Sequence, residues 1–560
     1  MLTQVQIPLT PETDVERVKR ASRNLRGDLA NDLATASPNV TSDSEHLLKF
    51  HGIYAQDNRD LRRELAQGGK PLDYIFMVRV VIPGGRLSPE QWMTLDRISS
   101  AHADETIRLT TRQAVQFHGV VKDGLRPLAS SLDAELLSSF AGCGDVVRNV
   151  VSCPDLQIDQ REEHLADISR TVSRAFRPTT NAHWEIFVNG DQAASRDDPA
   201  EQPFYGDTYL PRKFKIAVAH PEDNCVDVFA QDVGLIPLTH PEVGRGFNLI
   251  VGGGLGRSYA NPNTFARLGE ALGFVPHDEL CEVIAAIISA YRDLGDRGER
   301  RRARLKYVVA DLGISGFRAE IERRLGRVLL APQPHPTSFD ARDHLGWRTN
   351  ADGTHQVGIR VAAGRVRDVD GGSRLRSALR AIVEQFALTL YITPLQDIVV
   401  SGIAERDRAA VEALLVKYAV RDVDELGVVE RTALACPALP TCGQALAESE
   451  RRLPGLVADL EAALARRTLA HRPLQLRMTG CPNGCARPAV AEVGVVGRTK
   501  TTYDVYVGGG VRGDRLARIY REKVPLNQIA DVLDPLFERW EIDGLDDESF
   551  GDFLERSGLA

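Results

Sequence analysis

An internal repeat restricts the folds open to this chain more than any other feature. Residues 77–120 and 357–403 share one pattern, which is strand, glycine turn, helix, strand, turn and strand. Within them, 108-RLTTRQAVQFHGV-120 aligns without a gap to 391-YITPLQDIVVSGI-403. Because the apolar positions agree, the two segments are predicted to share one fold. Both copies also keep the residues at three further positions, which pair Thr110 with Thr393, Gln113 with Gln396, and Gly119 with Gly402.

The two copies differ at several positions where the first is polar. Arg108, Arg112, Gln116 and His118 are replaced in the second copy by Tyr391, Leu395, Val399 and Ser401. The first copy therefore has side chains suited to polar chemistry at positions where the second has side chains suited to packing. This asymmetry predicts that the first copy carries functional groups.

A second repeat extends the pattern over most of the chain. Residues 231–238 and 247–256 resemble residues 491–498 and 503–513. The order is then A–B–A′–B′, and it predicts an α+β fold built as a duplicated two-part module with pseudo-two-fold symmetry. A large ligand is expected between the halves, because interfaces between domains favour pockets. Both VGGG turns lack the GxGxxG spacing of a dinucleotide fold, and the second is best interpreted as a tight turn alone.

Composition excludes several classes of function. The chain has 560 residues and a formal net charge of −8, which argues against general nucleic-acid binding. No apolar run approaches the ~20 residues that a membrane span needs. The first residues lack a basic segment followed by an apolar one, so a secretory signal is not predicted. The expected compartment is the cytoplasm, or a plastid stroma if a transit peptide was removed.

The eight cysteines are unevenly placed and too few for a disulfide scaffold. Four lie in two pairs, a C-x5-C of Cys436 and Cys442 and a C-x3-C of Cys481 and Cys485. Prolines and glycine within the pairs predict loops. Structural zinc prefers CxxC knuckles, so an iron–sulfur cluster is favoured over zinc, and a disulfide is less favoured still. Of the other four, Cys225 and Cys281 are expected to be small buried apolar residues, Cys153 has no obvious partner, and Cys143 is considered below.

Several motifs together resemble the siroheme- and [4Fe–4S]-containing sulfite and nitrite reductases, and most closely the assimilatory sulfite reductase hemoproteins. They are 108-RLTTRQAVQFHG-119, 147-VRNVV-151, 209-YLPRKFK-215, 247-FNLIVGGG-254, 436-CPALPTC-442 and 479-TGCPNGCARP-488. The resemblance covers residues 20–555. It implies an N-terminal arm at 1–60, ferredoxin-like repeats at 61–145 and 346–425, a siroheme and substrate domain at 146–345 and a cluster-binding domain at 426–560. Residues 1–20 are equally compatible with a partly disordered tail.

The resemblance also implies roles for single residues. The four paired cysteines bind the [4Fe–4S] cluster, and Cys485 bridges it to the siroheme iron. The substrate oxyanion is held by Arg79, Arg148, Lys213 and Lys215. Siroheme contacts fall on Arg108, Arg112, Gln116, Arg304 and Lys306. Tyr54 and Cys143 are expected near the siroheme, where a thioether cross-link between them is one hypothesis and two uncoupled side chains are the other.

The same residues have plainer interpretations when taken alone. Arg79 in MVRVVI fits a solvated edge charge, and Lys213 and Lys215, two residues apart, fit a solvated strand face. His118 is more typical of a core histidine with its hydrogen bonds satisfied than of a ligand. Sulfite and nitrite are anions and siroheme carries eight carboxylates, so a pocket for both must be lined by arginine and lysine.

The expected reaction is the six-electron reduction of sulfite to sulfide. Lys215 favours sulfite over nitrite, because related nitrite reductases tend to have Asn at this position. The chain carries no flavin or nicotinamide domain, so electrons are expected from a partner, either an NADPH-oxidising flavoprotein subunit or a ferredoxin. The alternatives are a ferredoxin-type nitrite reductase, a non-enzymatic [4Fe–4S] binding protein without siroheme, and a zinc-stabilised scaffold.

Overall fold

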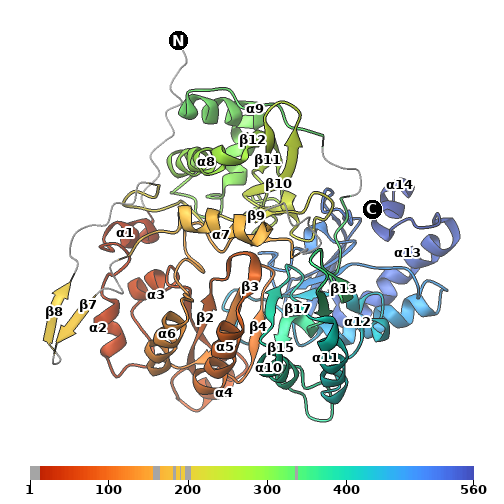
Figure 1. Cartoon of the computed structure of the whole chain (residues 1–560), viewed down its shortest axis with the longest axis horizontal. Coiled ribbons are helices and arrows are strands. Elements are labelled where there is room, and N and C mark those ends of the chain that lie inside the picture. Colours follow the sequence, from red (N-terminus) through yellow and green to blue (C-terminus); the bar gives the residue numbers. More distant parts are fainter. Residues whose placement is uncertain are drawn as a thin grey trace.

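The computed structural model describes residues 13–154, 164–180, 185–188, 191–195, 204–334 and 339–559 (Figure 1). Most of the tail considered at residues 1–20 lies outside them. The described part of the arm holds α1 (Asp14–Arg20), α2 (Leu29–Ala34) and α3 (Ser42–Leu48), followed after β1 by α4 (Arg62–Gln67). A hairpin of β7 (Glu185–Val188) and β8 (Asp191–Ser195) projects from one side of the molecule (Figure 1).

Two antiparallel sheets correspond to the first repeat. The first has the order β1 (Ile53–Asp57), β2 (Tyr74–Val80), β5 (Val115–Val120), β4 (Ile107–Leu109), β15 (Arg365–Val366). The other has the order β13 (Gly346–Thr349), β14 (His355–Ile359), β17 (Ile398–Ile403), β16 (Thr389–Ile392), β3 (Arg86–Leu87). The helices of these units are α5 (Pro89–His102) and α6 (Leu125–Ala134) in the first, and α10 (Leu375–Phe386) and α11 (Glu405–Lys417) in the second. The predicted boundary at residue 60 places β1 in the arm, whereas β1 pairs with β2 as the edge strand of the first sheet.

Each of these sheets takes its last strand from the other half of the chain. β15 pairs with β4, and β3 pairs with β16, both antiparallel. The two units therefore lie side by side (Figure 1, orange and teal) and exchange one short strand each. This exchange joins the two halves through backbone hydrogen bonds as well as through packing.

The second repeat forms two mixed sheets of identical order. One is β12 (Glu270–Pro276), β11 (Gly244–Val251), β10 (Val233–His240), β9 (Ile216–Val218), β6 (Val151–Ser152). The other, read from the opposite edge, is β22 (Arg518–Pro525), β21 (Thr502–Val507), β20 (Val493–Gly497), β19 (Leu476–Thr479), β18 (Leu434–Ala435). In both, the last three strands are parallel and the others antiparallel. The α+β fold and its duplication are confirmed.

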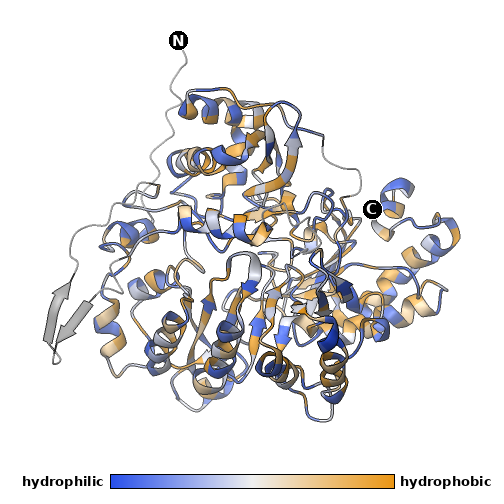
Figure 2. Cartoon of the chain, viewed as in Figure 1, coloured by the Kyte–Doolittle hydropathy of each residue, from blue (hydrophilic) through white to orange (hydrophobic). Residues whose placement is uncertain are grey.

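Apolar and polar residues are interspersed along the helices (Figure 2), and in α10 the buried ones lie on one face. α10 buries Leu375, Leu379, Ile382 and Val383, which follow the spacing of one helix face. The helices of the second pair of units are α7 (Leu165–Phe176), α8 (Leu280–Leu294) and α9 (Leu305–Leu325) in the first half, and α12 (Leu453–Ala465), α13 (Ile529–Asp543) and α14 (Phe550–Ser557) in the second. Among the described residues, no helix combines the length and the apolar character that crossing a membrane requires.

The glutamines kept by both copies of the first repeat bond across the junction between the halves. Gln113 has a φ of 50° and Gln396 a φ of 68°, so both occupy the same left-handed turn position. The amide of Gln113 donates to the carbonyl of Ile392 at 2.8 Å, and that of Gln396 donates to the carbonyl of Leu109 at 3.3 Å. The two copies have therefore kept a pair of reciprocal hydrogen bonds. These bonds, in addition to packing, explain why both copies have a glutamine at this position.

Replacing Gln113 with Ala is expected to lower the free energy of unfolding by about 1–3 kcal/mol, because buried carbonyl and N–H partners lose their bonds. The midpoint of thermal unfolding measures this effect. The exposed Gln67 offers a matched control, and Gln67→Ala should leave the midpoint within error. Equal midpoints for the two variants would contradict the role given to Gln113.

Candidate cofactor and anion site

The two cysteine pairs meet because they follow neighbouring parallel strands. Cys436 comes directly after β18, and Cys481 comes two residues after β19. In the register of the two strands, Leu434 lies beside Arg477 and Ala435 beside Met478. The carboxyl ends of parallel strands meet at one edge of a sheet, so the two loops share that edge. The backbone N–H of Gly480 donates to the Sγ of Cys436 at 3.3 Å.

The four thiols influence one another electrostatically. Burial raises the pKa of Cys436 and of Cys442, and the neighbouring Cys485 raises both further. Burial, again with Cys485, raises the pKa of Cys481 to about 12. Four mutually close thiolates need a positive partner, and the irons of a cubane supply one. Cys485 is the exposed member of the four, as a ligand facing a second cofactor would be.

Arg487 and Arg59 fix the cysteine loops, and sequence reasoning missed both. Arg487 donates to the carbonyl of Thr111 at 3.4 Å and to that of Pro394 at 3.1 Å, which lie in the equivalent turns of the two ferredoxin-like units. Arg59 donates to the carbonyls of Cys442 at 3.0 Å and Ala445 at 2.6 Å. The hydroxyl of Thr111 donates to the carbonyl of Cys485 at 3.1 Å.

The alignment of the second repeat could have identified Arg487 from the sequence, because it pairs this residue with one of opposite charge. Aligned copies place Arg487 opposite Asp227, and both residues have left-handed φ values, 59° and 48°. Their side chains form an ion pair with a 2.5 Å separation between the Arg487 Nε and an Asp227 oxygen. Arg477 binds the same oxygen at 2.6 Å. Two equivalent positions of opposite charge therefore meet between the halves.

A row of polar side chains crosses the first sheet. Arg79 on β2 lies opposite Gln116 on β5, which lies opposite Arg108 on β4. The guanidinium of Arg79 approaches the Sγ of Cys143 at 2.9 Å. With its amide oxygen turned toward Arg79, Gln116 accepts a hydrogen bond from it at 2.5 Å. Arg79 is therefore held inside this row and is not a solvated edge charge.

The second copy fills the matching positions by packing. Tyr391 and Val399 form an apolar cluster with Ala166, and Leu395 packs with Leu434 and Ala486. The polar and apolar copies thus occupy equivalent places in their sheets. His118 is buried on β5, and neither ring nitrogen has a hydrogen-bond partner within the described residues. Burial lowers its pKa to about 3, so the ring is neutral, and the expectation of satisfied hydrogen bonds is wrong.

Arg108 and Arg112 are buried cations with incomplete bonding. Arg108 donates to the carbonyl of Ala435 at 2.7 Å and lies 3.3 Å from Glu450. Arg112 donates to the side chain of Gln231 at 2.9 Å. Burial lowers the pKa of Arg108 to about 10 and that of Arg112 to about 9. The Nη1 of Arg108 and the Nε of Arg112 lack partners in the part of the chain that the structure describes, so both arginines can still bind an anion.

The four predicted substrate cations belong to one basic group. Burial lowers the pKa of Lys213 to about 7, and the charges of Arg148 and Arg212 lower it further. Burial and Lys213 lower the pKa of Lys215 strongly. Both lysines are influenced by the nearby Cys485. They flank the buried Phe214 and point to the same region, as residues two apart in a strand do. So many crowded cations favour an anionic ligand.

Tyr54 and Cys143 connect Arg79 and Arg148 within this group. Burial, and then the Cys143 thiol, raise the pKa of Tyr54, while Arg148 and Arg79 oppose the rise. Burial acts to lower the pKa of Arg148, but Tyr54 and Cys143 outweigh it and raise the net value. The side chain of Arg148 donates to the carbonyl of Gly144 at 3.2 Å. Tyr54 and Cys143 are therefore close neighbours of the basic group, and their cross-link stays a prediction.

Arg304 and Lys306 already have partners in this structure. Arg304 forms a two-pronged ion pair with Asp232 at 2.7 and 3.1 Å. The ammonium of Lys306 donates to the carbonyls of Gly254 at 3.0 Å and Gly256 at 2.7 Å, and also to that of Phe265. Lys306 thus orders the first VGGG turn, and its contact with siroheme stays a prediction.

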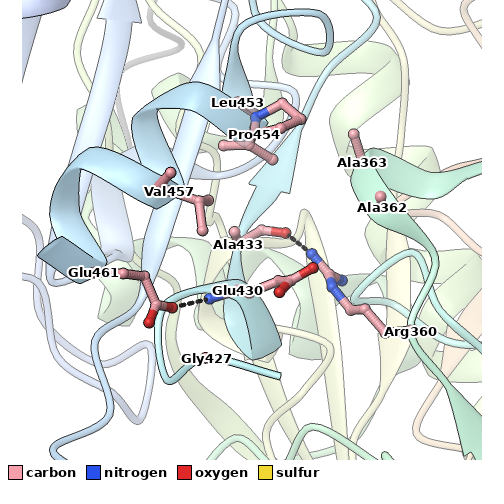
Figure 3. A pocket seen from close by; sticks show the side chains of 11 residues that line it. Arg360, Ala362, Ala363, Gly427, Glu430, Ala433, Leu453, Pro454, Val457 and Glu461 are labelled. Atoms are coloured by element: carbon pink, nitrogen blue, oxygen red, sulfur yellow. Dashed lines mark hydrogen bonds between the residues drawn. The ribbon is translucent and has the colours of Figure 1, made fainter. Parts of the chain in front are cut away.

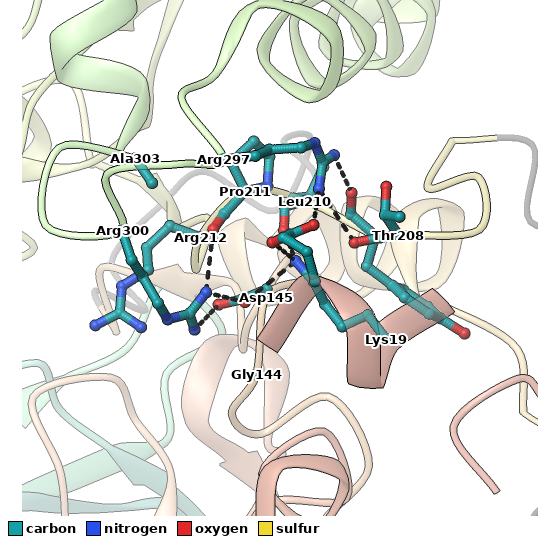
Figure 4. A network of polar contacts seen from close by, with 12 residues as sticks. Lys19, Gly144, Asp145, Thr208, Leu210, Pro211, Arg212, Arg297, Arg300 and Ala303 are labelled. Atoms are coloured by element: carbon teal, nitrogen blue, oxygen red, sulfur yellow. Dashed lines mark hydrogen bonds and ion pairs between the residues drawn. The ribbon is translucent and has the colours of Figure 1, made fainter. Parts of the chain in front are cut away.

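The N-terminal arm is joined to the segment that leads into the two lysines (Figure 4). Lys19 donates to the carbonyl of Leu210 at 2.9 Å and lies 3.5 Å from Asp145. Arg300 binds Asp145 at 2.8 Å, and Arg297 donates to the carbonyl of Tyr209 at 2.7 Å. Burial raises the pKa of Asp145, but Arg300 and Lys19 outweigh it and hold the net value far below the usual range. The network therefore fixes residues 208–212 from both sides.

Replacing Asp145 with Asn is expected to cost about 1–3 kcal/mol of stability, because Arg300 and Lys19 would lose a buried carboxylate partner, while Lys19 would keep its ion pair with Glu16. The anion site should be disturbed as well, because residues 208–212 lead directly into Lys213 and Lys215. The exposed ion pair of Arg17 and Asp43 at 3.0 Å gives the control, and Asp43→Asn should cost at most about 1 kcal/mol. Similar losses in thermal stability for both variants would contradict the role of this network.

A cavity of about 250 Å³ lies elsewhere, between α12 and the turn at residues 427–433 (Figure 3). Glu461 crosses it and accepts the backbone N–H of Val429 at 2.9 Å and that of Glu430 at 3.1 Å. Ala433 lines the cavity just before β18, whereas Cys436 follows the other end of that strand. No predicted cofactor or substrate residue lines it, so it is separate from the candidate site.

Comparisons with known proteins match this architecture. The nitrite/sulfite reductase ferredoxin-like half domain matches residues 68–135 and 348–418, and the nitrite and sulphite reductase 4Fe-4S domain matches residues 167–329. A sulfite reductase [NADPH] hemoprotein beta-component of Methylobacterium nodulans is 42% identical over 97% of this chain and 90% of its own. The chain belongs to the nitrite and sulfite reductase family. It is therefore an oxidoreductase whose cofactors are siroheme and a [4Fe–4S] cluster.

Further relatives agree with this assignment. A protein of the same description from Myxococcus xanthus is 41% identical over 98% of this chain and 97% of its own. The solved structure of the Mycobacterium tuberculosis NirA protein has a TM-score of 0.79 and 26% identity, covering 98% of this chain and 96% of that one. The 4Fe-4S domain match covers the first copy of the second repeat, whereas the four paired cysteines lie in the second copy.

The residues present fit the two family cofactors. Four cysteines lie on adjoining loops, and Arg108 and Arg112 keep buried N–H groups that have no partner among the described residues. The first set suits a cluster and the second suits the carboxylates of siroheme.

Proposed function

We propose that this protein reduces sulfite to sulfide. The observation that most supports this proposal is that the basic group of Arg148, Lys213 and Lys215 lies beside Cys485. The relatives described as sulfite reductases support the choice of sulfite. In the reaction, sulfite takes up six electrons and seven protons and yields hydrosulfide and three waters.

The protein groups of the site perform binding and proton supply. Arg79 and Arg148 can donate paired hydrogen bonds to the oxygens of sulfite, and Lys213 and Lys215 add compact positive charge. Because burial lowers the pKa of Lys213 to about 7, its ammonium can give up a proton near neutral pH. Siroheme and the cluster, when bound, supply the one-electron steps.

The binding groups of siroheme and the cluster are part of the same proposal. Cys436, Cys442, Cys481 and Cys485 would hold the cluster, and Cys485 would be the ligand nearest to siroheme. Arg108, Arg112 and Gln116 would bind siroheme carboxylates. This assignment is supported by the family resemblance and by N–H groups of Arg108 and Arg112 that have no partner within the described ranges.

The electron donor is proposed to be an NADPH-oxidising flavoprotein subunit. The relatives are described as components of an NADPH sulfite reductase, which supports this choice over a ferredoxin. The cytoplasm is the proposed compartment.

A direct assay tests the proposed reaction. Purified protein, reduced by methyl viologen, should form sulfide from sulfite, and kcat/KM for sulfite should exceed that for nitrite. An absorption spectrum with siroheme bands should accompany the activity. A larger kcat/KM for nitrite would instead favour the nitrite reductase alternative, and a spectrum of a cluster alone would favour a non-enzymatic [4Fe–4S] protein.

A further inference from the structure

Four buried side chains that the reaction does not use form a compact group. Cys153 follows β6, Asp223 and Cys225 lie in the loop after β9, and His344 lies just before β13. Their exposed fractions are 2%, 0%, 0% and 3%. They come from three separate segments of the chain, and none belongs to the cysteine pairs. Sequence reasoning assigned no function to Cys153 and treated Cys225 as an apolar core residue.

Three of the four ligand atoms have nearly the spacing of a metal coordination shell, and the fourth lies close by. All lie within 4.8 Å of one another. The Nε2 of His344 is 3.0 Å from the Oδ2 of Asp223, and the Sγ of Cys153 is 3.4 Å from that oxygen and 3.7 Å from that nitrogen. Zinc bonds of ~2.0 Å to nitrogen or oxygen and ~2.3 Å to sulfur place tetrahedral ligands roughly 3.3–3.8 Å apart. Two of these three distances fall in this range, and the third, between His344 and Asp223, is 0.3 Å below it.

The surrounding backbone orients the carboxylate for coordination. The Oδ1 of Asp223 accepts the N–H of Cys225 at 2.8 Å and that of Arg342 at 3.1 Å. The Oδ2 is thereby directed toward the cysteine and histidine side chains. Carboxylates that bind metals are typically oriented in this way. One oxygen accepts hydrogen bonds from the protein, and the other faces the metal.

The group already contains one charged pair. His344 and Asp223 are both buried, and 3.0 Å separates the Nε2 of the first from the Oδ2 of the second. A bound divalent cation would take the place of the protons on the imidazole and the thiols and would keep the buried carboxylate compensated.

We propose that Cys153, Asp223, Cys225 and His344 bind one Zn²⁺ ion in a closed, structural site. Two sulfurs, one imidazole and one carboxylate fill a tetrahedral shell, and burial leaves no open position for a substrate. Zinc is neither oxidised nor reduced, so the site takes no part in electron transfer.

The site would tie the first half of the molecule to the second. The backbone N–H of Asn224 donates to the carbonyl of Asp340 at 3.0 Å, so the loop after β9 already touches the segment that leads into β13. A shared ion would lock that contact and the end of β6 together. Strand β9 begins directly after Lys215 and leads into this loop, so one short strand connects the metal site to the basic group.

Metal analysis of the holoenzyme tests the proposal. Cells are grown with added zinc, and the purified protein is passed through a desalting column. Elemental analysis should find about one zinc per chain in addition to the iron of the two cofactors. Zinc K-edge X-ray absorption, which the iron does not obscure, should show two sulfur ligands at ~2.3 Å and two nitrogen or oxygen ligands at ~2.0 Å.

Variants separate this site from the other thiols. The double variant Cys153→Ser and Cys225→Ser should lose zinc at least tenfold, with iron content and siroheme absorbance kept. The half-buried Cys281 provides the control, and Cys281→Ser should keep its zinc. The conservative His344→Cys should retain zinc with three sulfurs.

Three results would overturn the proposal. They are zinc below about one tenth per chain in the wild type, full zinc in the double variant, and a mass two hydrogens lower that maps to a Cys153–Cys225 disulfide. If the double variant does not fold, the absorption spectrum of the wild type decides, because a coordination shell without two sulfurs contradicts the site. None of these readouts depends on sulfite reduction, so the proposed function is tested separately.

Discussion

Cys436→Ser is expected to remove the iron–sulfur cluster and to abolish sulfite reduction. Cys436 is buried, it receives the N–H of Gly480, and its loop shares an edge with that of Cys481. Loss of an outer-shell partner typically lowers metal affinity or activity 10–100-fold, so loss of a ligand should exceed ~100-fold. Iron content and sulfide formation with reduced methyl viologen measure the effect. Siroheme bands should weaken too, because Cys485 would lose the cluster that it shares.

The control for this experiment is another cysteine in the same chain. Cys281 lies on α8, where burial raises the pKa of its thiol, and Cys281→Ser should keep both iron and activity. Full iron content in Cys436→Ser would contradict the cluster assignment. A loss of iron in both variants would point to a general folding defect, which circular dichroism would reveal.

Lys213→Met and Lys215→Met are each expected to lower kcat/KM for sulfite by ~10²–10³-fold, the cost of removing one donor that stabilises developing negative charge. Both lysines lie in the basic group beside Cys485, so each change removes one cation from the anion site. Siroheme absorbance and iron content should stay unchanged, because neither lysine is assigned to the cofactors. Steady-state kinetics on cofactor-matched preparations measures the effect.

Charge and position can be separated by two further variants. Lys70→Met removes the same charge from an exposed residue outside the site and should leave the kinetics unchanged. Lys213→Arg keeps a cation and should recover part of the loss. Normal turnover in both Lys213→Met and Lys215→Met would refute the substrate site and leave the cofactor assignment in place.

The repeats in the sequence predicted the duplicated fold well. Apolar periodicity and glycine turns are local properties, so the alignment of residues 108–120 with 391–403 needs no tertiary information. The same alignment separated the polar Arg108 and Gln116 from Tyr391 and Val399 at the matching positions of the second copy. The boundary of the arm was less accurate, because β1 becomes a strand only by pairing with β2.

Contacts between distant segments were beyond the reach of sequence reasoning. Each ferredoxin-like sheet borrows β3 or β15 from the other half, and two residues carry too little pattern to predict a strand. Arg59 resembles an ordinary surface arginine until the fold places it against the loop of Cys442.

The sequence by itself determined the family, the duplication and the four paired cysteines. These features rest on spacing and periodicity, which a linear chain displays directly. Only the tertiary structure decided which cations surround Cys485, and that Asp227 meets Arg487 between the halves. It alone brought Cys153, Asp223, Cys225 and His344 together. The physical reason is that sheet pairing and packing set the distances between groups separated by tens or hundreds of residues, and the order of the sequence does not contain those distances.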